Sequence, residues 1–273
     1  MQPNYAQLIE LAKLAGDAIL TIYERSEYTT VTEKADNSPL TDADLAANEI
    51  ICAGLKDIED IPVVSEEADL PSQDERKRWR RFWLVDPLDG TKEFIDRNGE
   101  FTVNIALIEE GQPIFGLIYA PVLDTYYYGG ADKAYMKQGE EPAVAIKPSQ
   151  PLAQIRKQQP IRMFVSRRHG SEHIESLKEQ LEEKLAPVSP IPLGSSLKIA
   201  QLACGEGELY PRLGNVSEWD IAAGHAILRA AGGEILSRQF EPIIYGTKPT
   251  MVVPGFFALG TMDFDWRPIL LTA

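Results

Sequence analysis

The segment Trp83-Leu84-Val85-Asp86-Pro87-Leu88-Asp89-Gly90-Thr91 combines an apolar run, two carboxylates and a glycine turn. The apolar run is typical of a buried strand, and the proline after Asp86 prevents a helix from forming across this point. The second carboxylate, Asp89, is followed by Gly90, and we expect a helix to begin at Thr91. The segment therefore predicts a strand that ends in a turn where two acidic side chains meet.

This turn has the chemistry of a metal site. Asp86 and Asp89 can face one point on the bent backbone, and the Leu88 carbonyl can add a third oxygen, a ligand set that suits Mg²⁺. Free N–H groups at the start of a helix from Thr91 would suit a phosphate. One alternative is an ordinary Asp-Gly turn without a ligand. Another is the haloacid-dehalogenase phosphatase motif, whose end is similar to 88–91, but Pro87 stands where that motif needs its nucleophilic aspartate.

Composition limits the class of protein. The chain has 273 residues, of which 44% are hydrophobic and 25% charged, enough for one compact domain or two packed lobes. A formal charge of −14 disfavours nucleic acid and anionic lipid as partners. Cys52 and Cys204 lie in apolar helical patterns and are expected to be reduced core thiols. With no basic leader and no run of about 18 apolar residues, we expect a cytoplasmic protein without a transmembrane segment.

The first half of the chain predicts helices followed by strands. Apolar residues at helical spacing predict a helix over Tyr5–Tyr23, and a loop over Lys34–Leu40 leads to a second helix from Thr41 to about Leu55. Thr41 and Asp44 have capping-box spacing, so Asp44 could be only a helix cap. The short strand Ile61–Ser65 runs into Glu66 and Glu67. If this strand lies beside the one that ends at Asp86, one of these glutamates reaches the same metal.

The remaining pattern predicts an antiparallel meander and then an α/β lobe. The meander comprises strands at Phe101–Glu110, Ile114–Ala120 and Asp124–Gly129, and Lys137–Pro160 reads as a long connection at a lobe boundary. We therefore expect one catalytic unit with sub-lobes at about 1–150 and 155–273. The second lobe is predicted to contain strands Arg162–Ser166, Glu208–Arg212, Glu234–Leu236 and Phe256–Leu259, and helices Glu172–Leu185, Ser196–Cys204 and one opening at Ser217 and closing at Gly232-Gly233.

Three motifs together resemble the inositol monophosphatase superfamily. They are the pair Glu66-Glu67, the segment 86–91, and Trp219-Asp220 before a helix of small residues, in the family's order and spacing and with Thr41–Asp44 upstream. Within the superfamily, 90–95, 98–108, 194–198 and 207–212 are similar to the CysQ type of 3′(2′),5′-bisphosphate nucleotidase. The resemblance covers essentially the whole chain, and no catalytic position departs from it.

The resemblance implies an α+β fold, a layered αβαβα sandwich, and a Mg²⁺-dependent phosphomonoesterase without a covalent intermediate. It implies that Asp44 and Thr91 activate the water and that two or three Mg²⁺ ions are held by Glu66, Asp86, the Leu88 carbonyl, Asp89 and Asp220. Charge neutralisation by such ions and water activation by Asp44 are what phosphate ester hydrolysis needs. His169, His173 and His225 adjoin no motif serine or cysteine, so the sequence does not support a triad.

The substrate implied is adenosine 3′,5′-bisphosphate, hydrolysed to AMP in sulfur metabolism, with 3′-phosphoadenylyl sulfate as a second substrate. The phosphate would contact Glu66, Leu88, Asp89, Gly90, Thr91 and Asp220. The second phosphate and the base need cations and a flat apolar surface, for which Lys198, Tyr210 and Arg212 are the candidates. The alternatives are an inositol or broader sugar phosphatase, and a nucleotide sensor without turnover. The protein could be a monomer or a homodimer.

Overall fold

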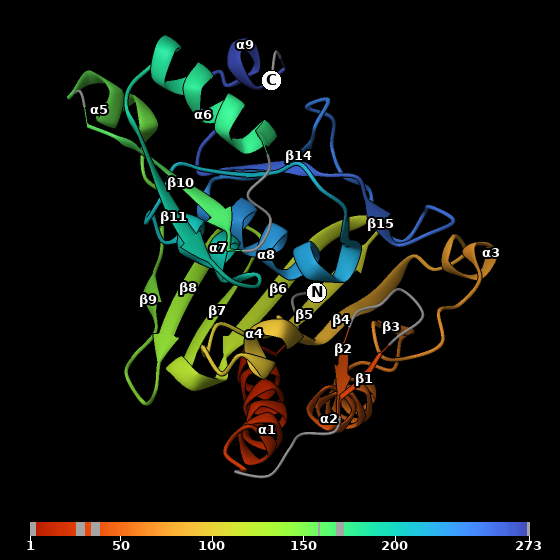
Figure 1. The fold of residues 1–273 in the computed structure, drawn as a ribbon. Helices are drawn as coiled ribbons and strands as arrows, with labels where there is room; N and C mark the ends of the chain where they lie inside the picture. Colours follow the sequence, from red (N-terminus) through yellow and green to blue (C-terminus); the bar gives the residue numbers. More distant parts are fainter. Residues whose placement is uncertain (1–3, 26–30, 34–38, 158, 168–171, 272–273) are drawn as a thin grey trace.

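A computed structural model describes residues 4–25, 31–33, 39–157, 159–167 and 172–271. Its described helices and strands form alternating layers, with two sheets separated and flanked by helices (Figure 1). This is the predicted α+β layered arrangement. A membrane-spanning helix, which must be both long and apolar, is not found among the described residues.

The first layer contains helices α1 (Tyr5–Tyr23) and α2 (Asp42–Ile58), and the first of them has the predicted bounds. Their apolar faces pack on the larger sheet, where residues such as Leu8, Ala47 and Trp83 are fully buried. A short hairpin of β1 (Val31–Glu33) and β2 (Pro39–Thr41) precedes α2. Of the loop predicted at Lys34–Leu40, residues 34–38 lie outside the described part.

The larger sheet has seven strands in chain order. Only the first pair, β3 with β4, is parallel, and every later pair is antiparallel, which confirms the predicted meander. Short helix α3 (Gln73–Arg76) connects β3 to β4. The strands are β3 (Val63–Ser65), β4 (Arg81–Asp89), β5 (Thr102–Glu109), β6 (Gln112–Ala120), β7 (Thr125–Gly130), β8 (Lys133–Gln138) and β9 (Val144–Ala145).

The middle layer consists of α7 (Leu197–Ala203) and α8 (Glu218–Ala231), which pack between the two sheets. Helix α8 crosses the larger sheet very closely at β6. A Cβ built on Gly116 would lie 2.0 Å from the Ala223 carbonyl oxygen, so only glycine allows this approach. Gly232, at φ 113°, ends α8 in the left-handed conformation, as the Gly-Gly pair predicts.

The smaller sheet has five strands in the order β11, β10, β12, β16, β14. They are β10 (Ile161–Ser166), β11 (Val188–Leu193), β12 (Leu209–Arg212), β14 (Glu234–Ser237) and β16 (Phe256–Leu259). Helices α6 (Glu172–Lys184) and α9 (Arg267–Leu270) cover its outer side as the last layer. The short strands β13 (Val216–Ser217) and β15 (Val252–Val253) form a separate antiparallel pair.

The sequence-based prediction missed regular structure at two places in this region. The connection predicted at Lys137–Pro160 contains the end of β8, the short β9 and helix α5 (Pro151–Arg156). Strand β11 was not predicted, because Pro190 and Pro192 interrupt its pattern. Both prolines are tolerated since β11 is an edge strand, where a missing N–H need not break a ladder.

Candidate active site

Strand β4 delivers the first carboxylate. Its register with β5 shifts between Asp86 and Asp89, so Pro87 falls in a bulge and the strand continues through it. Asp86 is 1% exposed, and its Oδ1 accepts a hydrogen bond from the Leu88 N–H at 3.0 Å. Gly90, at φ 95°, then turns the chain into α4 (Thr91–Ile95), a helix of only five residues.

Strand β3 brings Glu66 to the same place. It runs parallel to β4, with Ser65 opposite Val85, and the Glu66 N–H donates to the Val85 carbonyl at 3.1 Å. Strand β3 therefore ends beside the middle of β4, where Glu66 follows Ser65 and Asp86 follows Val85. This is the arrangement on which the sequence argument for a shared site depended.

Helix α8 supplies a third carboxylate from its first turn. Asp220 Oδ2 accepts from the Ser217 N–H at 2.8 Å, in a capping box that fixes the side chain at the helix start. One carboxylate oxygen from each of Glu66, Asp86 and Asp220 lies within 4.8 Å of the others. Asp89 lies beside this cluster and lines the same pocket as Asp220.

The electrostatics of the cluster favour a bound cation. Burial, followed by the charges of neighbouring carboxylates, raises the pKa of Asp86 and of Asp220 well above the usual value. Burial also raises the pKa of Asp89 to about 6, against the opposing effects of Lys198 and the Ser196 N–H. Converging oxygens whose charges repel one another are the donor set that a hard divalent cation stabilises. The residues present thus fit a metal ion.

Asp44 and Thr91 meet at the edge of this cluster. Asp44 is 1% exposed, and its Oδ2 accepts from the backbone N–H and the hydroxyl of Thr41, at 2.8 and 2.5 Å. This is the helix cap that the sequence allowed. Its Oδ1 is approached by the Thr91 hydroxyl at 3.3 Å, which also lies 3.4 Å from the Leu88 carbonyl oxygen. Asp44 therefore combines a capping role with a second oxygen directed toward Thr91.

The three candidate substrate residues line one pocket together with Asp89 and Asp220. Lys198 is 4% exposed, and its Nζ donates to the carbonyls of Leu193 and Ser195 at 3.1 and 2.6 Å. Burial lowers the pKa of Lys198 to about 8, although the nearby Asp89 opposes this effect. The Lys198 Nζ also lies 5.3 Å from the centre of the Tyr210 ring.

Arg212 lies at the same end of the pocket as Lys198. It donates to the Ser166 hydroxyl at 3.0 Å and to the Asn215 carbonyl at 3.2 Å, and its buried Nε has no partner among the described residues. Tyr210 is 4% exposed and packs edge-on against Phe256. The pocket is thus lined by carboxylates, by cationic side chains and by an aromatic ring.

Several residues in and beside the pocket have no role in the sequence-based prediction. Ser196 donates its backbone N–H to Asp89 Oδ2 at 2.5 Å. Glu100 accepts the Gly194 N–H at 2.7 Å and the Arg167 Nε at 2.6 Å, so it holds the loop before α7. The segment 194–198 had been singled out only as a family-like motif. Its contact with Asp89 spans 107 residues of sequence and could not be inferred from spacing.

Comparison with known proteins was decisive for the family. The model of the inositol monophosphatase family matches residues 1–255. The chain belongs to the inositol monophosphatase family. The 3′(2′),5′-bisphosphate nucleotidase CysQ of Shigella flexneri, in the same family, is 45% identical over 251 residues, covering 92% of this chain and 97% of the relative.

Solved structures agree with this assignment. The family member CysQ from Bacteroides thetaiotaomicron has a TM-score of 0.77 and 39% identity, covering 93% of this chain and 96% of that one. The Thermotoga maritima IMPase has a TM-score of 0.76 over 97% of this chain and 95% of its own, with 20% identity, and so supports the fold alone. The layered fold is therefore that of inositol monophosphatase family members.

Proposed function

We propose that this chain is a Mg²⁺-dependent 3′(2′),5′-bisphosphate nucleotidase that removes the 3′-phosphate of adenosine 3′,5′-bisphosphate to give AMP. The observation that carries this proposal is the pocket itself. One cavity is lined by the carboxylates Asp89 and Asp220 together with Lys198, Tyr210 and Arg212. A nucleotide bisphosphate has two anionic groups and a flat base, which match a metal held by the carboxylates, the cationic side chains and the aromatic ring.

The relatives support the same substrate class. The Shigella flexneri and Bacteroides thetaiotaomicron proteins, both similar to this chain over more than nine-tenths of its length, are CysQ proteins. The Haemophilus influenzae CysQ bisphosphate nucleotidase is 33% identical over 96% of this chain. We infer that this chain acts in sulfur metabolism, with 3′-phosphoadenylyl sulfate as a second substrate, and that its two lobes form one catalytic unit in the cytoplasm.

The metal end would hold two or three Mg²⁺ ions through Glu66, Asp86, the Leu88 carbonyl, Asp89 and Asp220. When bound, the ions supply neutralisation of charge on the phosphate and on the leaving oxygen. The protein's own contribution is to fix these oxygens on β3, β4 and α8 before substrate arrives. Their rigidity comes from the β3–β4 pairing and from the capping box at Ser217.

Asp44 would accept the proton of the attacking water at Oδ1. Its other oxygen, Oδ2, is occupied by two hydrogen bonds from Thr41, so the carboxylate cannot rotate freely. The Thr91 hydroxyl, 3.3 Å from Oδ1, would orient the water against this oxygen. Lys198 has two carbonyl acceptors for its three N–H groups, and the third would donate to a phosphate oxygen of the substrate.

The test is phosphate release from adenosine 3′,5′-bisphosphate and from inositol 1-phosphate, each assayed with Mg²⁺ and with chelator. We expect Mg²⁺-dependent turnover that strongly favours the nucleotide. Lys198→Met should raise the KM for the bisphosphate by about tenfold or more while changing inositol 1-phosphate hydrolysis little, since a hydrogen bond to a charged group contributes about 1.5–3 kcal/mol. Preference for inositol 1-phosphate would overturn the substrate, and folded, metal-loaded protein that hydrolyses neither would indicate a sensor.

A further inference from the structure

One carboxylate oxygen of Asp89 accepts hydrogen bonds from two different parts of the fold. Its Oδ2 accepts from the Ser196 N–H, at the start of α7, and from the Asn104 amide Nδ2 on β5 at 3.4 Å. The first contact belongs to the second lobe and the other to the larger sheet. Because both donors act on Oδ2, Oδ1 is left for other partners.

A chain of hydrogen bonds behind Asp89 sets the direction of these contacts. The Ser196 hydroxyl donates to Asn104 Oδ1 at 2.8 Å, and Thr102 Oγ1 lies 2.8 Å from the same hydroxyl. Since the single Ser196 hydroxyl proton is used on Asn104, Thr102 must be the donor to Ser196. With its Oδ1 occupied as an acceptor, the Asn104 amide has to turn its NH₂ group toward Asp89.

All of these groups are sealed from solvent. Thr102 and Asn104 are 0% exposed, and Ser196 is 3% exposed. A buried polar chain of this kind is stable only when each member finds its partner, so loss of one hydroxyl leaves the others unsatisfied. The chain therefore specifies one orientation of the Asn104 amide and, through it, one orientation of the Asp89 carboxylate.

The loop that contains Ser196 also contacts the cationic side chain of Lys198. Lys198, two residues after Ser196, donates its Nζ to the Ser195 carbonyl at 2.6 Å. Ser195, Ser196, Lys198 and Asp89 all line the pocket. A phosphate drawn to Lys198 would thus act on a loop whose next residue fixes Asp89.

We propose that Ser196, Asn104 and Thr102 are positioning residues that orient the Asp89 carboxylate for metal and couple ligand binding at Lys198 to metal binding at Asp89. The inference rests on the proposed function, because it takes Asp89 as a metal ligand. Groups that orient a metal ligand typically change metal affinity by about 10–100-fold when removed. The coupling runs through the Ser195–Ser196 loop, which contacts both Lys198 and Asp89. By linkage it is reciprocal, so the factor by which a ligand at Lys198 tightens metal binding equals the factor by which metal tightens that ligand.

The experiment measures Mg²⁺ dissociation constants by calorimetric titration, with and without AMP as the probe for the nucleotide end. For Ser196→Ala we expect Mg²⁺ affinity about tenfold weaker or worse, and the tightening of Mg²⁺ binding by AMP to disappear. Ser196→Thr keeps the hydroxyl and should retain both the wild-type Mg²⁺ affinity and its tightening by AMP. Thr102 is the last residue in the row of hydrogen bonds behind Asp89, so Thr102→Val should also weaken Mg²⁺ binding, by a smaller factor.

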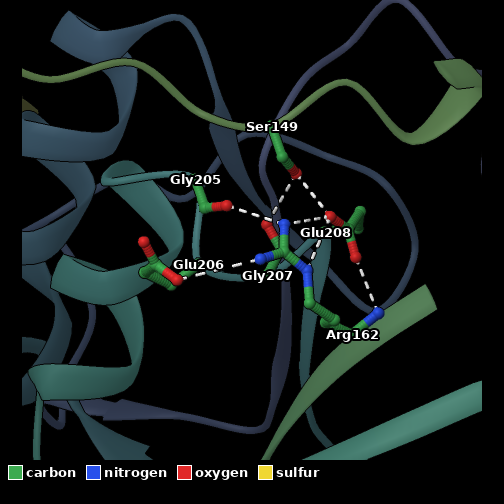
Figure 2. Close-up of polar contacts among 6 residues, drawn as sticks. All are labelled: Ser149, Arg162, Gly205, Glu206, Gly207 and Glu208. Carbon is green, nitrogen blue, oxygen red and sulfur yellow. Dashed lines mark hydrogen bonds and ion pairs between the residues drawn. The ribbon is translucent and has the colours of Figure 1, made fainter. Parts of the chain in front are cut away.

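Ser149→Ala is the matched control (Figure 2). The Ser149 hydroxyl donates to Glu208 Oε1 at 2.6 Å, so this variant also removes a hydroxyl that donates a hydrogen bond to a buried carboxylate. Glu208 is further held by Arg162, and neither Ser149 nor Glu208 lines the pocket described above. Ser149→Ala should lower the melting temperature and leave the Mg²⁺ constant unchanged.

Two results would overturn the proposal: an unchanged Mg²⁺ constant in folded Ser196→Ala, or an equal weakening in Ser149→Ala. Failure of the proposed function has a different signature. A wild-type protein that binds Mg²⁺ but releases no phosphate from the nucleotide would refute the function, while the comparison of Mg²⁺ constants would still decide whether Ser196 orients the ligand.

Discussion

Replacing Asp89 with asparagine should stabilise the metal-free protein and weaken its response to Mg²⁺. Asparagine keeps the shape and an oxygen that can accept from the Ser196 N–H and the Asn104 amide. It removes the charge that burial disfavours. The rise in the pKa of Asp89 from 3.8 to about 6 means that ionising this carboxyl at neutral pH costs the fold stability.

The size of the effect follows from that shift. One pKa unit is about 1.4 kcal/mol, and solvent reaches this half-buried side chain, so we expect a gain on the order of 1–3 kcal/mol in Asp89→Asn. For a chain of this length, about 2–4 °C of melting temperature corresponds to each kcal/mol. The variant should therefore melt several degrees above wild type in chelator.

Magnesium should reduce this difference in melting temperature. At about 100 times its dissociation constant, Mg²⁺ stabilises the wild-type fold by about 2.7 kcal/mol, and the variant gains less because it has lost a charged ligand. The assay is a pair of thermal melts at pH 7.5, in chelator and in saturating Mg²⁺. A variant that melts below wild type in chelator, or that gains as much from Mg²⁺, would refute the reasoning.

Three further predictions use other parts of the fold. Asp44→Asn should lower kcat by about 10²–10⁴-fold and leave the Mg²⁺ dissociation constant unchanged, as steady-state kinetics and titration would show. Burial opposes ionisation of Glu234, but the hydrogen bond and charge of His225, the charge of Arg229 and the Ile235 N–H together outweigh it and lower the pKa of Glu234 from 4.5 to about 2, so stability is lost as pH falls below 4.5. Glu234→Gln should flatten this loss in urea melts between about pH 5 and 3. Gly116→Ala, whose Cβ would meet the Ala223 carbonyl at 2.0 Å, should cost about 1–3 kcal/mol or more in chemical unfolding and displace α8.

Local patterns predicted much of the fold. The bounds of α1 and the closing glycine of α8 follow from apolar spacing and cap chemistry, which act within one or two turns. Strand β11 could not be predicted, because its prolines are tolerated only through its place at a sheet edge. Such placement is a property of the assembled sheet and leaves no local pattern.

The candidate site divides in the same way. Asp86, Asp89 and Asp220 are recognisable because each sits at a turn or helix start with its own motif. The link between Asn104 and Asp89 is different, because Asn104 lies inside an apolar strand pattern and its role becomes visible only when Ser196 comes to lie beside it in the fold. Long-range contacts of this kind need the folded structure.

The most direct test of the account identifies which phosphate is removed from adenosine 3′,5′-bisphosphate. Phosphorus NMR of the reaction in Mg²⁺ distinguishes the two nucleotide products. With the 3′-phosphate at Asp89 and Asp220 and the 5′-phosphate at Lys198 and Arg212, the product should be AMP with its phosphate on the 5′ oxygen, and chelator should abolish the reaction. Accumulation of the 3′-monophosphate instead, or turnover that persists in chelator, would contradict the account.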